Sequence, residues 1–195
     1  LWGSSLRDWQ WVLGVNLWGV IHGVHTFVPI MLEQGAEGHI VNTGSVAGLL
    51  PIHLSMATYA ISKHAVVAIS EQLYLELAQR KAKIGVSVLC PSSVNTRLGD
   101  AARNRPQQLK DEIAQERDEF IRAAWAREEH GLDKGASPQE VAQAAFQAIR
   151  DEQLYVLPHR GLLPLIEARF QGILAERNPD VSLFTGPARW GGKPE

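Results

Sequence analysis

The 195-residue sequence lacks several features that would place it in a specialised class of protein. Its single cysteine, Cys90, cannot form an internal disulfide, and we interpret it as a small core residue rather than a reactive thiol. The net charge is only −2, with acidic and basic residues interspersed, which argues against a nucleic-acid-binding surface. No positively charged start followed by an apolar stretch resembles a signal peptide. We therefore expect one soluble domain in the cytoplasm.

Charge is also missing from one long stretch, Trp9 to Leu32, which contains no Asp, Glu, Lys or Arg. This stretch is long enough to span a bilayer. It also carries three glycines and polar residues that are costly in hydrocarbon, among them Gln10, Asn16, His22, His25 and Thr26. We expect no membrane contact, and instead a helix that begins near Ser5, runs to about Gln34 and is buried within or between subunits.

Two histidines, His53 and His64, invite a metal-binding role. His53 and His64 have no carboxylate or cysteine cluster at ligand spacing beside them. Zinc sites are built from such clusters. We expect no metal site.

The most informative feature that is present is a tyrosine, Tyr59, with a lysine four residues on, at Lys63. On a helix the two side chains share a face, and the ammonium favours the phenolate, which lowers a tyrosine pKa from its usual value of about 10. Ser45 adds a hydroxyl. Such a group of side chains can protonate a carbonyl oxygen or take the proton of an alcohol. An exposed lysine one turn from a half-buried tyrosine remains the alternative interpretation.

The surrounding pattern indicates where these side chains lie. An apolar strand at Gly38–Ser45 is followed by a helix at about 57–80 and by a second strand at Ile84–Pro91, and a third strand is expected near 153–157. Parallel α/β sheets bind ligands beyond the carboxyl ends of their strands. The prediction is a doubly wound, parallel-sheet Rossmann-type α/β fold with Ser45 at such an end.

Five stretches in order resemble the short-chain dehydrogenase/reductase family, over nearly the whole chain to about residue 160. The family's Asn-Ser-Tyr-Lys tetrad matches Asn16, Ser45, Tyr59 and Lys63. The matching segments are DWQWVLGVNLWGV, GHIVNTGSVAG, CPSSVNTRL, SPQEVAQAAFQAI and QLYVLP. The resemblance implies an oxidoreductase that uses NAD or NADP to interconvert a carbonyl compound and an alcohol, and a homodimer or homotetramer in the full-length protein.

The resemblance also implies roles for individual residues. Tyr59 is the general acid or base, Ser45 stabilises the substrate oxygen, Lys63 holds the cofactor ribose, and Asn16 anchors a water that relays protons. The implied cofactor-binding residues are Tyr59, Lys63, Pro91, Ser92, Val94 and Thr96. The implied substrate-binding residues are Ser45, Val46, Leu50, His53, Met56 and Tyr59.

Two positions depart from the family pattern. Gly44 stands where relatives often have serine, a change that should be tolerated. Ser92 stands where they usually have glycine, and its Cβ would crowd a cofactor that approaches the backbone closely.

The family's glycine-rich Gly-x-x-x-Gly-x-Gly turn is missing, and residue 1 matches a point just past the family's fourth strand. We therefore expect residues 1–160 to be the C-terminal part of a single Rossmann-type domain, short of on the order of a hundred residues and inactive alone. Residues 97–135 are expected to form a substrate lid, and 161–195 an extension whose tail, from Phe184, is loosely ordered. A non-catalytic fragment and a cofactor-retaining epimerase or dehydratase remain alternatives.

Overall fold

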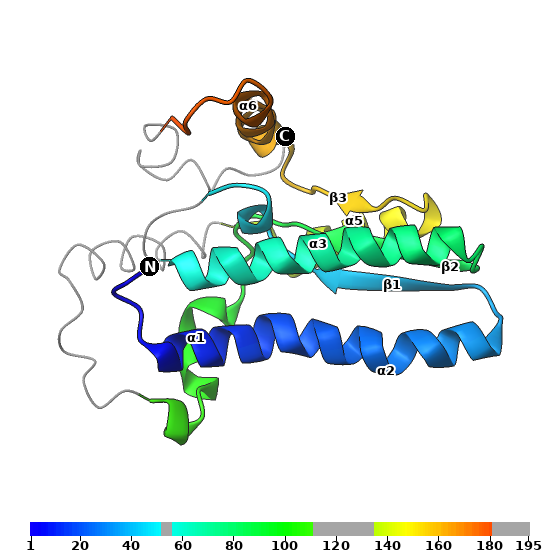
Figure 1. Ribbon diagram of the computed structural model, residues 1–195, viewed down its shortest axis with the longest axis horizontal. Helices are drawn as coiled ribbons and strands as arrows, with labels where there is room; N and C mark the ends of the chain where they lie inside the picture. Colours follow the sequence, from blue (N-terminus) through cyan, green and yellow to red (C-terminus); the bar gives the residue numbers. More distant parts are fainter. Residues whose placement is uncertain (52–55, 111–134, 181–195) are drawn as a thin grey trace.

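The computed structural model describes residues 1–51, 56–110 and 135–180, which form a parallel sheet with helices on both faces (Figure 1). The strands are β1 (Gly38–Thr43), β2 (Ile84–Leu89) and β3 (Tyr155–Val156), in the order β1-β2-β3. All pairing is parallel, from Gly38 opposite Ile84 to Leu89 opposite Val156. The predicted Rossmann-type α/β fold is confirmed. Within the described residues β1 pairs on one side only, so that its other edge is open.

The middle strand, β2, lies at the centre of the core. Its apolar residues Val86 and Val88 are almost completely buried. Ser87 is equally buried, but its hydroxyl donates to the Gln153 carbonyl at 2.7 Å and lies 2.8 Å from Nε2 of His39. These partners compensate for the burial of a polar group, which would otherwise cost stability.

A long helical rod begins the chain and consists of α1 (Leu6–Leu13), a π-helical turn η1 (Gly14–Trp18) and α2 (Gly19–Gln34). Ser5 and Asp8 form a capping box at its start, and Gly35 ends it in the left-handed region at φ 62°. The helix predicted to run from near Ser5 to Gln34 is confirmed. The π-helical turn, which contains Asn16, was not predicted.

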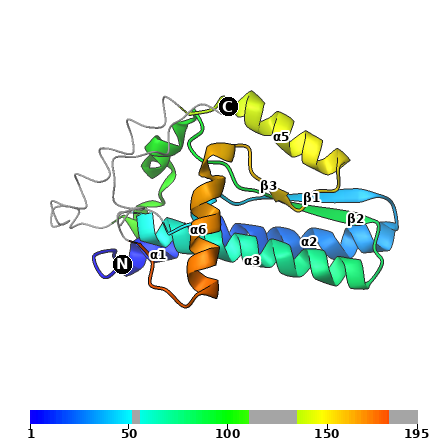
Figure 2. The ribbon, with the colours of Figure 1, turned by 90° about the horizontal axis from the view of Figure 1, so that it is seen from above.

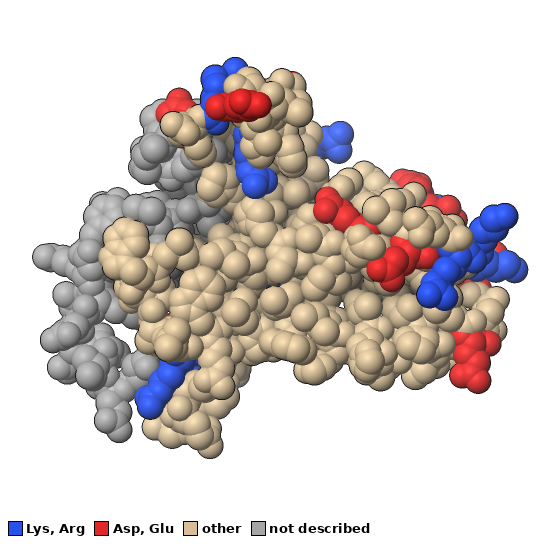
Figure 3. Space-filling model, in the orientation of Figure 1, with Lys and Arg blue, Asp and Glu red and all other residues tan. Residues whose placement is uncertain are grey.

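The rod is the one helix among the described residues that is long and apolar enough to cross a membrane, by length and composition alone. Its most apolar window is not buried inside this chain, and its surface carries almost no charge between the ends (Figure 3). Burial within the subunit was therefore a wrong prediction, because only the face bearing Val24, Val28 and Met31 packs on the core. Burial between subunits stays a prediction.

Helix α3 (Ala57–Gln79) runs beside α2 on one face of the sheet, and α5 (Pro138–Arg150) covers the other (Figure 2). The bounds predicted for α3 hold to within a residue. Small buried residues, Ser62 and Ser70, bring α3 close to its neighbours, and Ser70 accepts a hydrogen bond from Asn42 of β1 at 3.0 Å. Helix α5 starts at a serine cap, since Ser137 and Glu140 form a capping box.

The chain after residue 160 contributes a helix that the sequence reasoning missed. Helix α6 (Leu163–Leu174) follows a short 3₁₀ turn, η6 (Arg160–Leu162), and packs over the loop after β1. The first part of the expected lid forms two 3₁₀ turns, η4 (Arg97–Asn104) and η5 (Gln107–Leu109). Residues 111–134 of the expected lid and the tail from Phe184 lie outside the described residues.

The contact between the loop after β1 and helix α3 depends on Gly48. A Cβ atom at this position would lie 2.5 Å from the Lys63 carbonyl oxygen and 2.9 Å from Cγ2 of Val67. We expect Gly48→Ala to destabilise the protein by about 1–3 kcal/mol, as overpacking does. Urea unfolding measures this change.

The matched control is Gly172→Ala in α6, where a Cβ would meet nothing within 4 Å. Because glycine is costly inside a helix, this control should stabilise the protein by roughly 0.5–1 kcal/mol. Equal stability of the two variants would contradict the close approach at Gly48.

Candidate active site

The carboxyl ends of β1 and β2 meet the N-terminal part of α3. Ser45 follows β1 and caps a short 3₁₀ turn, η2 (Val46–Gly48), by accepting from the Ala47 N–H at 3.1 Å. The loop after β2 reaches the same place, because the Pro91 carbonyl accepts from the Val46 N–H at 2.9 Å and from the Ser45 hydroxyl at 3.3 Å. Two segments distant in sequence are thereby fixed to each other at this edge of the sheet.

Tyr59 and Lys63 complete this group from the first turns of α3. The Ser45 side chain lies near enough to the Tyr59 phenol to lower its pKa. The Lys63 ammonium lies 5.7 Å from the centre of the Tyr59 ring and donates to the Thr43 carbonyl at 2.8 Å, with only 9% of the residue exposed. The structure thus brings three of the four tetrad residues together at the carboxyl end of β1.

The electrostatics of the pair differ from the expectation. Burial raises the pKa of Tyr59 above its usual value, and this outweighs the Ser45 hydrogen bond, which lowers it. Burial also lowers the pKa of Lys63, since it disfavours the ammonium. In the protein by itself desolvation dominates, so that the net shift of the Tyr59 pKa is upward, and the effect of Lys63 on it stays a prediction. The phenol is neutral at physiological pH and able to donate a proton.

Asn16 lies beside this group rather than in direct contact with the phenol. Its side-chain amide donates to the Ser62 hydroxyl at 3.0 Å, and Ser62 in turn donates to the Tyr59 backbone carbonyl at 2.6 Å. Asn16 and Lys63 line the same cavity of about 520 Å³, between the helical rod and the open edge of β1. The π-helical turn holds Asn16 at this cavity, and such turns are frequent at functional sites.

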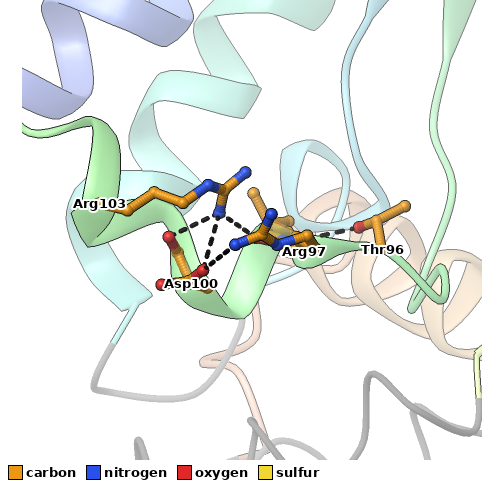
Figure 4. A network of polar contacts seen from close by, with 5 residues as sticks. Thr96, Arg97, Asp100 and Arg103 are labelled. Atoms are coloured by element: carbon orange, nitrogen blue, oxygen red, sulfur yellow. Dashed lines mark hydrogen bonds and ion pairs between the residues drawn. The ribbon is translucent and has the colours of Figure 1, made fainter.

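The loop after β2 holds the remaining residues expected to bind a cofactor. Pro91, Ser92 and Val94 are partly buried, and Val94 forms a β-bridge with Ala136. Thr96 is exposed and caps η4, where Arg97 and Arg103 form ion pairs with Asp100 (Figure 4). This network is solvent-exposed, and we assign it little stability.

The residues expected to bind substrate differ in how far they are buried. Val46 and Leu50 are buried and pack against Leu162 beneath α6, so that in this arrangement they do not form an open pocket wall. Met56 is half-buried at the start of α3. His53 lies outside the described residues.

Two polar contacts at this end of the sheet were missed by the sequence reasoning. The Arg169 guanidinium in α6 donates to the Leu49 carbonyl at 2.7 Å. His159 accepts a hydrogen bond from the Ser92 N–H at 3.1 Å. Both join segments far apart in the chain, and no local pattern points to either.

The fold and the Ser45–Tyr59–Lys63 group define a Rossmann-type α/β protein with a candidate acid–base centre. A family model described as short chain dehydrogenase matches residues 4–107, more than half of the sequence. The chain therefore belongs to the short chain dehydrogenase family.

Several known proteins are similar to this chain. The CLA biosynthesis dehydrogenase/reductase of Lactiplantibacillus plantarum is 29% identical over 95% of this chain and 65% of its own length. The C alpha-dehydrogenase of a Sphingobium strain is 34% identical, over 88% of this chain and 54% of its own. A solved short chain dehydrogenase/reductase from Burkholderia phymatum, in complex with NAD, is 42% identical with a TM-score of 0.88. This match covers 92% of this chain and 63% of that one. The chain thus spans between half and two thirds of these relatives.

Proposed function

We propose that this protein is an NAD(P)-dependent oxidoreductase that interconverts a ketone or aldehyde and the corresponding alcohol. The observation that carries the proposal is the convergence of a neutral phenol, a hydroxyl and a buried ammonium at the carboxyl end of β1. Relatives are named dehydrogenases, and the similar Burkholderia protein binds NAD. These likenesses support the proposed reaction class and do not identify the substrate.

The residues present fit a nicotinamide cofactor. The Lys63 ammonium has three hydrogens to donate, and the described residues give it one acceptor, the Thr43 carbonyl. Two hydrogens therefore remain for a diol such as that of a ribose. The loop at Pro91, Ser92 and Val94 lies at the same end of the sheet, where α/β folds bind nucleotides. When bound, the nicotinamide supplies or accepts the hydride.

The side chains themselves move the proton and stabilise charge. In reduction the Tyr59 phenol protonates the carbonyl oxygen, and in oxidation its phenolate takes the proton of the alcohol. The Ser45 hydroxyl donates to the same oxygen and stabilises the charge that develops on it. In the oxidation direction the positive charge of Lys63 favours the phenolate form of Tyr59. Asn16 holds a water in the adjoining cavity, and this water connects Lys63 to solvent.

The test uses the protein in the longest form that its gene encodes. Calorimetric titration with NAD⁺, NADH, NADP⁺ and NADPH should show binding of one pair, at about micromolar affinity. With that pair, a panel of ketones, aldehydes and alcohols should change the absorbance of the reduced nicotinamide. Absence of binding to all four cofactors would overturn the proposal. Tight binding with no net redox change on any panel member would favour a cofactor-retaining epimerase or dehydratase instead.

A further inference from the structure

A buried histidine holds the loop after β2 from outside the active site. His159 follows β3, and only 8% of its surface is exposed. Its Nδ1 accepts a hydrogen bond from the Ser92 backbone N–H at 3.1 Å. Because Nδ1 is the acceptor, the imidazole is neutral and its proton is on Nε2.

The other ring nitrogen is not satisfied. Within the described part of the chain, Nε2 of His159 is the one buried side-chain nitrogen or oxygen that has no hydrogen-bond partner. An unsatisfied buried donor destabilises the folded protein, because it has given up its hydrogen bonds to water without replacement. Stability alone therefore does not account for histidine at this position, and an unsatisfied group of this kind calls for another explanation.

Neighbouring points of the same loop are also fixed. The Pro91 carbonyl accepts from Val46, and the Ser93 carbonyl accepts from the Ala136 N–H at 3.0 Å. Gly135 allows this close approach, because a Cβ there would lie 2.5 Å from the Ser93 carbonyl oxygen. His159 fixes the intervening Ser92 peptide. Every residue of the loop from 91 to 94 therefore has a backbone contact that holds it in place.

We propose that His159 is a positioning residue for the nicotinamide cofactor: its neutral imidazole sets the orientation of the Ser92 peptide and, through it, of Pro91 and Val94. The inference rests on the proposed function, which assigns this loop to the cofactor.

Protonation of the imidazole removes the acceptor for the Ser92 N–H. Burial favours the neutral ring and lowers the pKa of His159 from 6.5, while the Ser93 backbone and Glu140, at the start of α5, act in the opposite direction. The next residue, Arg160, is exposed. Cofactor affinity that depends on neutral His159 is therefore complete above pH 6.5 and is lost as the pH falls through the lowered pKa.

Two variants separate this role from a purely structural one. His159→Asn keeps an oxygen acceptor near the position of Nδ1 and does not titrate. His159→Leu removes the acceptor and leaves the Ser92 N–H without it. In the longest form of the protein, we expect His159→Leu to raise the cofactor Kd about tenfold, the effect of one lost buried hydrogen bond, with kcat at saturating cofactor changed only a few-fold. His159→Asn should bind within about threefold of wild type near neutral pH.

The pH profile is the decisive measurement. The wild-type Kd should rise only below about pH 6.5, as the pH falls through the lowered pKa of His159, and that of His159→Asn should stay flat. A His159→Leu variant that binds like wild type, or a His159→Asn variant with the same loss in acid, would overturn the proposal. If His159→Leu does not fold, the His159→Asn profile decides. Wild type that binds neither NAD(H) nor NADP(H) would instead refute the proposed function.

Discussion

Replacing Tyr59 with phenylalanine is expected to lower turnover by about 10²–10⁴-fold, the usual contribution of a general acid or base. The substitution removes the proton donor and leaves the ring in place above the Lys63 ammonium, 5.7 Å from its centre. Since Lys63 and the loop after β2 are unchanged, the Kd for the nicotinamide cofactor should stay within a few-fold. Turnover and calorimetric binding, measured on the same preparation, separate the two effects.

The matched control is Tyr74→Phe, on the same helix, where the tyrosine is 41% exposed. This variant should keep both turnover and cofactor affinity. Turnover of Tyr59→Phe within a few-fold of wild type would show that another group transfers the proton.

The second large effect is expected from Lys63→Met, which should lower turnover at least about 100-fold, weaken cofactor binding about tenfold or more, and raise the melting temperature. Lys63 as a whole residue is nine-tenths buried, and burial lowers its pKa, so that keeping the ammonium charged costs stability. Methionine fills similar space without that cost. A gain in stability accompanied by a loss of activity is typical of a functional residue.

The difference in stability between Lys63→Met and the wild type should depend on pH. Because the pKa of Lys63 is lower in the folded protein than its ordinary value of 10.5, the wild type gains stability as the pH rises through the lowered pKa toward 10.5. The advantage of Lys63→Met should therefore shrink at alkaline pH. Lys83→Met, at an exposed lysine, serves as the control and should show neither effect. A variant that is both active and unchanged in cofactor affinity would remove Lys63 from the site.

The central part of the site could be predicted because its information is local. Tyr59 and Lys63 lie one turn apart on a helix, and Ser45 ends the strand that precedes this helix, so that their order in the chain brings them together. The strand and helix bounds followed from apolar patterns and caps in the same way. The open edge of β1 does not affect the positions of these side chains, because they are held by contacts with α3 and with the loop after β2.

The missed features depend on contacts between distant segments. Val46 and Leu50 look like pocket residues from their position in the loop, but Leu162 of η6 and the start of α6 cover them. The hydrogen bond between Ser92 and His159 joins residues 67 positions apart. The pKa of Tyr59 depends on burial, which no local pattern reveals. Long-range packing therefore decides how the predicted side chains are surrounded, and not which side chains they are.

The π-helical turn at Gly14–Trp18 sets the rotational phase between the two halves of the helical rod. On its amino-terminal side, Asp8 and Trp11 contact Arg105 through an ion pair and a ring contact. On its carboxyl-terminal side, Val24 and Val28 pack on the core. Each residue of an α-helix advances the face by about 100°, so deletion of one residue from this turn would rotate one set of contacts by that angle relative to the other. The number of residues in this turn is thus as constrained as their identity.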